Sequence, residues 1–174
     1  VENVKNIEES IKSIKHRGPD DHGHYIDKNN LFSFAHSRLS ILDLSENGSQ
    51  PMNSHDNQYM ITFNGEIYNH LELRKDLTDK IEFRSKSDTE TLLEYISFFG
   101  LEQTLKKIRG MFAFAIWDQK RKSIKIIRDQ FGEKPLYYSI YNNTLFFSSE
   151  IKTLFQNFKL PSLINKNSLN IFLY

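Results

Sequence analysis

The sequence contains no cysteine. Without a thiol, these residues can form no disulfide, hold no thiolate-bound metal and offer no cysteine nucleophile. No other metal site is expected in this chain. The absence of cysteine bears on the catalytic chemistry discussed at the end of this section.

Long runs of one residue class are also missing. No apolar run approaches the roughly 20 residues that cross a bilayer, and no signal peptide is visible. No long basic run is present. The 23 Lys and Arg are offset by 22 Asp and Glu, which gives a formal net charge of +1. We therefore expect a cytoplasmic protein with no membrane or nucleic-acid partner.

The composition that is present predicts a packed domain. Apolar residues make up 39% of the 174 positions, with 14 Phe and 8 Tyr, so one core that buries roughly two-thirds of the unfolded surface is expected. The chain begins at Val1 within a helical pattern and without methionine. We interpret it as an internal piece of a longer protein.

Hydrophobic periodicity predicts an antiparallel α+β architecture, since strands follow one another in hairpins without regular βαβ alternation. Helices are expected at 4–14, 71–77, 88–99, 101–108 and 149–155, and strands at 24–26, 31–36, 58–63, 111–117, 124–128, 136–141 and 144–148. Turns or loops are expected at 20–23 and 45–56, an extended segment at 38–44, and a capping box from Ser87 to Glu90. The apolar run 111–117 must be covered on both faces, which predicts two packed sheets flanked by helices.

The stretch 64–69, Asn-Gly-Glu-Ile-Tyr-Asn, is the centre of the functional hypothesis. It is predicted to end the strand at 58–63 and lead into a helix. The Asn64 amide and the bare Gly65 N–H are groups that can hold an oxyanion. A tight turn with no further role is the alternative for an isolated Asn-Gly pair.

Two charged residues lie at predicted element ends. Arg38 could bind a carboxylate in two-point fashion, and Asp88 could accept an ammonium group. With Asn64 and Gly65 they would form a glutamine-shaped pocket if the elements converge. The structural alternatives are an ion pair of Arg38 with Asp43 or another carboxylate, and a helix-dipole role for Asp88 worth ~0.3–1 kcal/mol. His36 is predicted to pack at a strand edge.

Six ordered motifs resemble the glutaminase domain of glutamine-dependent asparagine synthetases, a class II glutamine amidotransferase family. They cover the chain from about residue 16 to 155 and are highly specific together. They are His-Arg-Gly-Pro-Asp at 16–20, His-Ser-Arg-Leu-Ser-Ile at 36–41, Asn-Gly-Glu-Ile-Tyr-Asn at 64–69, Ser-Asp-Thr-Glu at 87–90, Gly-Met-Phe-Ala-Phe-Ala at 110–115, and Arg128-Asp129 with Phe-Gly-Glu-Lys-Pro-Leu-Tyr-Tyr at 131–138.

The resemblance implies an N-terminal-nucleophile hydrolase fold with αββα layers, and it implies roles for individual residues. Arg38 would bind the glutamine α-carboxylate and Asp88 the α-ammonium. Asn64 and Gly65 would form the oxyanion hole, and the Glu66 main chain would help to hold the substrate. Arg17 and Gly18 would lie near the nucleophile. The main chain of four further residues would line the pocket: Leu39, Ser40, Ile41 and Leu42.

One departure from the family is decisive. The family's nucleophile is an N-terminal cysteine on a first strand, and neither occurs here. We favour truncation over loss of the nucleophile, because the clamp and oxyanion residues remain, and we expect this chain alone to be inactive. Residues 1–160 are predicted to form the amidotransferase domain, and 161–174 the linker and start of a synthetase domain.

The resemblance further implies that the missing domain would use ATP and Mg²⁺ to amidate aspartate. No cofactor is expected in this chain, whose partners would be glutamine and that synthetase domain. A homodimer is one arrangement expected of the parent protein.

Two alternatives stay open at this point. The first is a glutaminase domain with another acceptor, such as a sugar carboxylate, because the residues that choose the acceptor lie outside this chain. The second is a glutamine-binding or scaffold module without a nucleophile.

Overall fold

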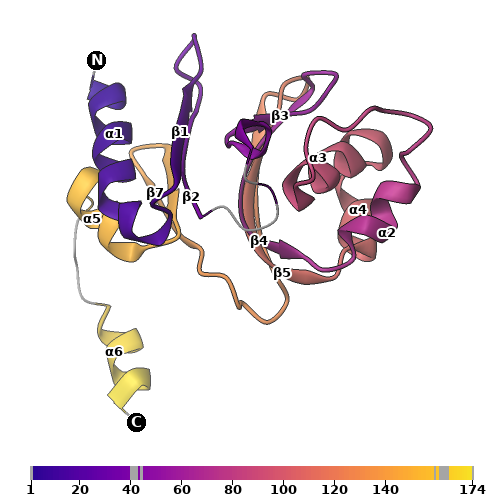
Figure 1. The fold of residues 1–174 in the computed structure, drawn as a ribbon. Helices are drawn as coiled ribbons and strands as arrows, with labels where there is room; N and C mark the ends of the chain where they lie inside the picture. The colour runs from indigo at the N-terminus through magenta and orange to yellow at the C-terminus, as the bar shows by residue number, and fades with distance from the viewer. Residues whose placement is uncertain (1, 40–42, 44, 159, 161–164, 174) are drawn as a thin grey trace.

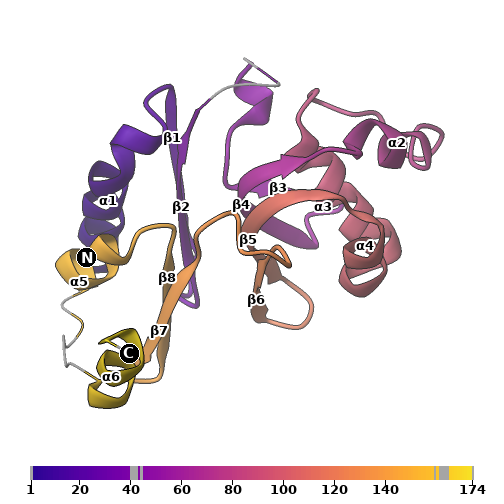
Figure 2. The same ribbon diagram turned by 90° about the horizontal axis from the view of Figure 1, so that it is seen from below.

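The structure is a computed structural model that describes residues 2–39, 43, 45–158, 160 and 165–173. Figures 1 and 2 show its elements in four layers, two of strands between two of helices. The helices are α1 Glu2–Ile14, η1 Lys15–Arg17, η2 Glu46–Gly48, α2 His70–Lys75, α3 Asp88–Phe99, α4 Leu101–Lys107, α5 Ile151–Phe158 and α6 Lys166–Leu173. The strands are β1 Asp21–Ile26, β2 Ser33–Arg38, β3 Met52–Asn53, β4 Tyr59–Ile67, β5 Gly110–Asp118, β6 Ser123–Arg128, β7 Tyr137–Tyr141 and β8 Thr144–Ser148.

The strands of the described residues form three antiparallel sheets, not the two that the sequence predicted. The largest has the order β3-β4-β5-β6, and the other two are the hairpins β1-β2 and β7-β8. The two hairpins lie in one layer between the helices α1 and α5 and the large sheet, whose far face is covered by α2, α3 and α4 (Figures 1 and 2). The mixed α/β class with antiparallel sheets is confirmed.

The large sheet is buried on both faces, as its apolar central strand predicted. On the side of α2 and α3, Ile61 and Phe63 of β4 pack in a core with helix residues such as Leu92 and Ile96. On the opposite side, Met60 packs with residues such as Phe34 and Trp117. Because side chains alternate across a strand, consecutive residues of β4 serve different cores. Asn64 therefore falls on the same face as Met60, toward the hairpin layer.

The predicted end of the strand at residue 63 is wrong. β4 continues through Asn64 and Gly65 to Ile67, because β5 supplies a partner for all nine of its residues, from Tyr59 opposite Asp118 to Ile67 opposite Gly110. Gly65 is needed for packing rather than for a turn. A Cβ there would overlap the carbonyl oxygen of Met111.

Two other local predictions are also wrong. The expected turn at Asp21 and Gly23 is part of β1, where Gly23 pairs with His36 and the Gln50 carbonyl occupies the space of a Cβ. Ser87 does cap α3, accepting a hydrogen bond from the Thr89 N–H at 3.1 Å. Its predicted box partner Glu90 instead accepts hydrogen bonds from Arg84 and Ser85, because that loop folds back over the helix.

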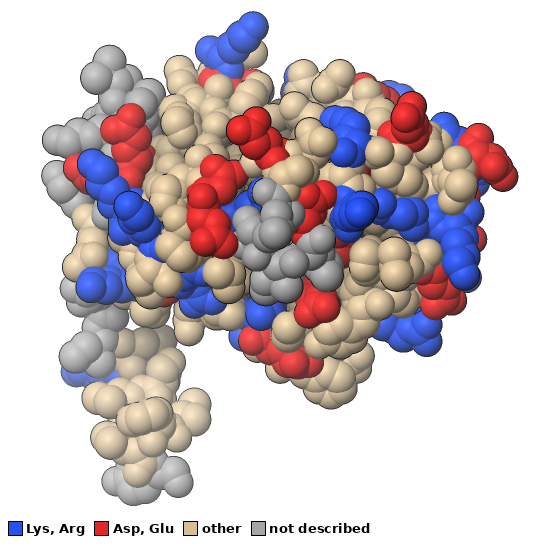
Figure 3. Space-filling model, viewed as in Figure 1, with Lys and Arg blue, Asp and Glu red and all other residues tan. Residues whose placement is uncertain are grey.

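The two hairpin predictions are confirmed. β5 pairs with β6 and β7 pairs with β8, and the turn between the latter two contains Asn142 and Asn143 at φ 48° and 56°. These angles suit the tight hairpin turn that asparagine favours. On the face seen in Figure 3, acidic and basic side chains are interspersed. None of the described helices is long and apolar enough to span a membrane.

Candidate functional site

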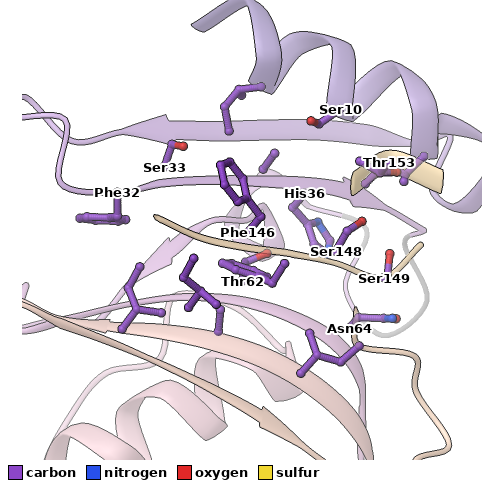
Figure 4. Close-up of a pocket in the computed structure, with 18 of the residues that line it drawn as sticks. Ser10, Phe32, Ser33, His36, Thr62, Asn64, Phe146, Ser148, Ser149 and Thr153 are labelled. Atoms are coloured by element: carbon purple, nitrogen blue, oxygen red, sulfur yellow. The ribbon is translucent and has the colours of Figure 1, made fainter. Parts of the chain in front are cut away.

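A cavity of about 610 Å³ lies between the hairpin layer and the large sheet. Its walls come from α1, β2, β4, β5, β8 and α5 (Figure 4). Phe32 and Phe146 contribute to its apolar lining. His36 and Asn64 lie with Ser148 and Ser149 at one end of the view. The cavity is therefore lined by both apolar and polar side chains, as ligand sites commonly are.

Several polar atoms along this cavity are buried without a hydrogen-bond partner among the described residues. They are the Asn64 Nδ2, the His36 Nδ1 and the Ser37 Oγ. Buried polar groups are nearly always paired in native proteins, so each such atom requires an explanation. An amide donor and an imidazole nitrogen facing a cavity are explained most simply by an occupant that pairs with them.

Two strand edges also border the cavity. Among the described strands, β2 pairs with β1 alone and β8 pairs with β7 alone, and residues of both line the cavity. Each of these strands therefore has one edge that lacks a strand partner. Unpaired edges present rows of N–H and C=O groups that an added strand can satisfy.

The outer edge of β4 carries the predicted oxyanion donor. Phe112 directs its N–H and C=O toward Asp129, so it forms a non-hydrogen-bonded pair with Gly65 opposite. The Gly65 N–H therefore points away from β5, along the edge shared with Phe63 and Ile67. The N–H groups of Phe63 and Ile67 donate to the Gln50 Oε1 at 2.6 Å and to the Asp88 Oδ2 at 2.8 Å. Within the described part of the chain, no recorded acceptor takes the Gly65 N–H between them.

Arg38 ends β2 and is 9% exposed. Its guanidinium donates to the Ser45 carbonyl oxygen at 2.8 Å and to the Asp43 carbonyl oxygen. Gly48 leaves room for the guanidinium, since a Cβ there would overlap its Nη2. No carboxylate of the described residues forms an ion pair with Arg38, so the surface ion-pair interpretation is not supported. Described residues accept from two of its five N–H groups, which leaves donors for a ligand as far as this part of the chain is concerned.

Asp88 is the first residue of α3 and is 5% exposed. Burial raises the pKa of its carboxyl group, while the Ile67 N–H and the nearby His70 act in the opposite direction. A buried carboxylate that has used one oxygen on a backbone N–H is suited to accept a cation at the other. A role for Asp88 in the helix dipole alone would require neither its burial nor its hydrogen bond to the Ile67 N–H.

Hydrogen bonds connect these residues across the fold. Asp43, whose carbonyl accepts from Arg38, also accepts with its Oδ2 from the Lys86 N–H at 2.7 Å, two residues before Asp88. Asp88 in turn binds Ile67, three residues after Asn64. Gln50 gives a second link, because its side chain contacts the Phe63 N–H and the Thr89 Oγ1. Hydrogen bonds thus link the segments that carry the predicted clamp and oxyanion residues, and of these four residues only Asn64 lines the cavity.

The structure places the remaining predicted residues less centrally. Arg17 lines the cavity, and Gly18 packs so closely on the Ser37 main chain that a Cβ would overlap it. The N–H and C=O of Glu66 lie on the β5 side of the strand, opposite Met111, and its substrate role stays a prediction. Leu39 is 57% exposed at the end of β2. Ser40, Ile41 and Leu42 lie outside the described residues.

Two residues were missed or undervalued by the sequence analysis. Gln50 was assigned to a surface loop, yet it is 7% exposed and braces β4. His36 does lie in a strand, but its ring also reaches the Phe63 carbonyl at 3.1 Å and lines the cavity. Its place in the motif beside Arg38 was the only available signal. Among the described residues there is no group of three or more metal-ligating side chains.

Comparisons with known proteins place this chain in a family. The family described as "Glutamine amidotransferase domain" matches residues 1–174. Asparagine synthetase [glutamine-hydrolyzing] 1 of Bacillus subtilis is 46% identical over 149 residues, which are 85% of this chain and 23% of that protein. Asparagine synthetase B [glutamine-hydrolyzing] of Escherichia coli is 38% identical over 155 residues, or 88% of this chain and 27% of the relative.

A further relative has a different name. The amidase chry2 of Gibberella zeae is 36% identical over 150 residues, which are 86% of this chain and 22% of the relative. The chain thus spans about a quarter of the length of these curated relatives. Since the family match extends over every residue, this chain belongs to the glutamine amidotransferase domain family.

Proposed function

We propose that this chain is the glutaminase portion of an asparagine synthetase-type enzyme and that the parent protein hydrolyses glutamine to glutamate and ammonia. The observation that carries the proposal is the juxtaposition at β4. The Asn64 amide nitrogen is buried at the cavity with no hydrogen-bond partner among the described residues. The adjacent Gly65 N–H lies on a strand edge between two N–H groups that already donate to side chains. Two such donors can stabilise the negative oxygen that forms when an amide carbonyl is attacked.

The substrate roles follow from charge and burial. Arg38 would bind the glutamine α-carboxylate with its remaining N–H groups, and Asp88 would bind the α-ammonium. Glutamine held at these two ends would direct its side-chain amide along β4 toward Asn64 and Gly65. Both clamps are buried, at 9% and 5% exposure, which strengthens charge-assisted hydrogen bonds relative to those in water.

The nucleophile would come from a segment that precedes Val1 in the parent. We expect a strand with an N-terminal cysteine to lie in the cavity between the free edges of β2 and β8, and so to join the two hairpins into one sheet. The resulting arrangement would be the αββα fold of N-terminal-nucleophile hydrolases. Three features support this: two strand edges that no described strand pairs with, the cavity of about 610 Å³ beside them, and the buried atoms that face it without a partner in the described part of the chain.

The chemistry balances as two acyl transfers. The cysteine's α-amino group would take the thiol proton while the sulfur attacks the side-chain amide carbon, and the tetrahedral oxyanion would bind Asn64 and Gly65. The C–N bond would then break, with a proton from the cysteine's α-amino group completing the ammonia that leaves. Water would hydrolyse the thioester, releasing glutamate and restoring the thiol. This chain without its cysteine would not carry out the first step.

The acceptor is the second part of the proposal. Residues 1–160 would form the amidotransferase domain, and residues 161–174 would lead into a synthetase domain that uses ATP and Mg²⁺ to add ammonia to aspartate. The names of the Bacillus subtilis and Escherichia coli relatives support aspartate. A glutaminase domain with another acceptor, such as a sugar carboxylate, is the second candidate.

The test uses the full-length parent protein. Glutamate release from glutamine would be measured first, and asparagine formation from aspartate, ATP and Mg²⁺ second, with glutamine labelled with ¹⁵N in its side chain. The proposal expects glutamate release and ¹⁵N in asparagine. Glutamate release without asparagine would favour another acceptor. The absence of glutamate release by a folded protein that has an N-terminal cysteine would overturn the glutaminase assignment in favour of a glutamine-binding or scaffold module.

A further inference from the structure

His36 connects the cavity to the strand that holds the oxyanion donors. It lies on β2, and its Nε2 is 3.1 Å from the carbonyl oxygen of Phe63, the residue before Asn64. A carbonyl oxygen can only accept, so the Nε2 must carry the hydrogen. Burial lowers the pKa of His36 to about 4, which keeps the ring neutral near pH 7. The Nδ1 is then a bare hydrogen-bond acceptor.

That acceptor has no visible partner. The His36 Nδ1 is buried and lacks a hydrogen bond among the described residues, and His36 lines the cavity together with Asn64. Figure 4 shows both residues in the cavity wall, on strands that face each other. The Asn64 Nδ2 is a donor in the same situation. An occupant of the cavity that offers an N–H group would satisfy the imidazole nitrogen.

The Nε2 of the ring helps to fix β4, the strand that carries Asn64 and Gly65. Both polar groups of the Phe63 main chain bond to side chains, the N–H to the Gln50 Oε1 at 2.6 Å and the C=O to the His36 Nε2. β3 covers this edge of β4 with only two residues. Beyond them, the side chains of Gln50 and His36 form the hydrogen bonds that a neighbouring strand would otherwise form. The Nε2 of His36 therefore bonds to the main chain of β4, whereas its Nδ1 is available to an occupant of the cavity.

We propose that His36 is a positioning residue whose Nδ1 accepts a hydrogen bond from an N–H group of the nucleophile-bearing segment, while its Nε2 holds the main chain next to Asn64. This inference rests on the proposed glutaminase function. The imidazole would set the distance between the attacking sulfur and the oxyanion donors without touching the glutamine. Small displacements of reacting groups lower rates by roughly 100-fold, so a single bridging side chain can matter greatly.

The test compares two amide substitutions in the full-length parent. His36→Gln places an N–H near the position of the Nε2 but no acceptor at the Nδ1, whereas His36→Asn places an acceptor near the Nδ1 and does not reach Phe63. His24→Gln is the matched control, because His24 is exposed on β1 and lines no part of the cavity. The readouts are kcat and KM for glutamine and the saturating rate of covalent labelling by 6-diazo-5-oxo-L-norleucine, followed by mass spectrometry.

We expect His36→Gln to lower both kcat and the labelling rate by roughly tenfold or more, with KM changed less than about threefold. His36→Asn should lose less than His36→Gln, and His24→Gln should match the wild type. Wild-type rates for His36→Gln, or rates for His36→Asn that are lower than those for His36→Gln, would overturn the role of the Nδ1. Slow glutamine turnover with normal labelling would also overturn it, because the probe lacks the amide group and the Nδ1 would then be contacting substrate.

A spectroscopic measurement covers the case in which a variant does not fold. In wild-type protein with ¹⁵N-labelled histidine, the His36 Nδ1 resonance should lie upfield of that of a free unprotonated imidazole nitrogen, as expected for a hydrogen-bond acceptor. A free-nitrogen position would refute the inference. If the wild type is neither labelled nor active, the proposed function fails as well. If the wild type and His36→Gln are labelled at the same rate, only the inference about His36 fails.

Discussion

The Ile67 N–H donates a hydrogen bond to the Asp88 Oδ2 at 2.8 Å. This contact joins the outer edge of β4 to the first residue of α3, 21 positions later in the chain. It places a buried carboxylate on the strand edge from which the Gly65 N–H also points, two residues before Ile67. The distance between the predicted ammonium clamp and the predicted oxyanion hole is therefore set by a hydrogen bond within the protein.

Asp88→Asn tests the clamp in the parent protein. The amide oxygen can still accept from Ile67, but the charge that would attract the ammonium group is lost. We expect kcat/KM for glutamine to fall roughly 10- to 100-fold, mainly through KM, because hydrogen bonds to charged groups contribute about 1.5–3 kcal/mol. Steady-state kinetics would measure this, with Asp79→Asn, an exposed residue, as the control. An unchanged KM would contradict the assignment of Asp88.

Asn64→Ala tests the oxyanion hole. Removal of one donor typically costs ~3–4 kcal/mol of transition-state stabilisation, so we expect kcat for glutamine hydrolysis to fall roughly 100- to 1,000-fold. Stability should change little, because no described residue pairs with the Asn64 Nδ2. The control is Asn53→Ala on the exposed part of β3. Near-normal hydrolysis by a folded Asn64→Ala protein would remove this residue from the mechanism.

Asp129→Ala tests a structural prediction in the sixth motif. The carboxyl group is buried, which opposes ionisation, but backbone N–H donors including those of Lys134, Glu133 and Phe112 outweigh this and lower its pKa to about 2. Loss of these bonds should lower the free energy of unfolding by at least about 3 kcal/mol. Urea unfolding monitored by circular dichroism would measure it. Since the folded pKa is depressed, the stabilisation should be present above about pH 4 and be lost as the pH falls toward 2.

His36 predicts a second pH effect, on stability. Burial is the main cause of its lowered pKa, with Arg38 acting in the same direction and the Phe63 carbonyl and Asp21 in the opposite one. The unfolded chain binds a proton near pH 6.5 and the folded chain near pH 4. The free energy of unfolding should therefore fall by about 2–3 kcal/mol as the pH decreases across this interval. Comparison of unfolding curves at pH 7 and pH 4.5 for the wild type and His36→Phe would isolate the effect, and identical pH dependence would contradict it.

Local patterns predicted the elements that depend on neighbouring residues. The helix at 88–99 with its Ser87 cap and the hairpin across Asn142 and Asn143 follow from side-chain spacing and turn chemistry. The burial of β5 on both faces followed from its uninterrupted apolar residues. Where partners outside the local pattern decide, prediction failed. β4 runs past Gly65 because β5 continues opposite it, and Glu90 leaves its expected cap because Arg84 and Ser85 fold back onto it.

The same division holds for the candidate site. The sequence alone determined the family through the order of its motifs, and it predicted which residues could bind glutamine, since Arg38, Asn64, Gly65 and Asp88 carry suitable donor and acceptor groups. Only the tertiary structure showed that hydrogen bonds link the segments that carry these groups and that His36 and Gln50 bond to the main chain of Phe63, next to Asn64. The physical reason is that hydrogen bonds such as those from Lys86 to Asp43 and from Ile67 to Asp88 join segments separated by 21 to 43 residues. No local pattern specifies such contacts.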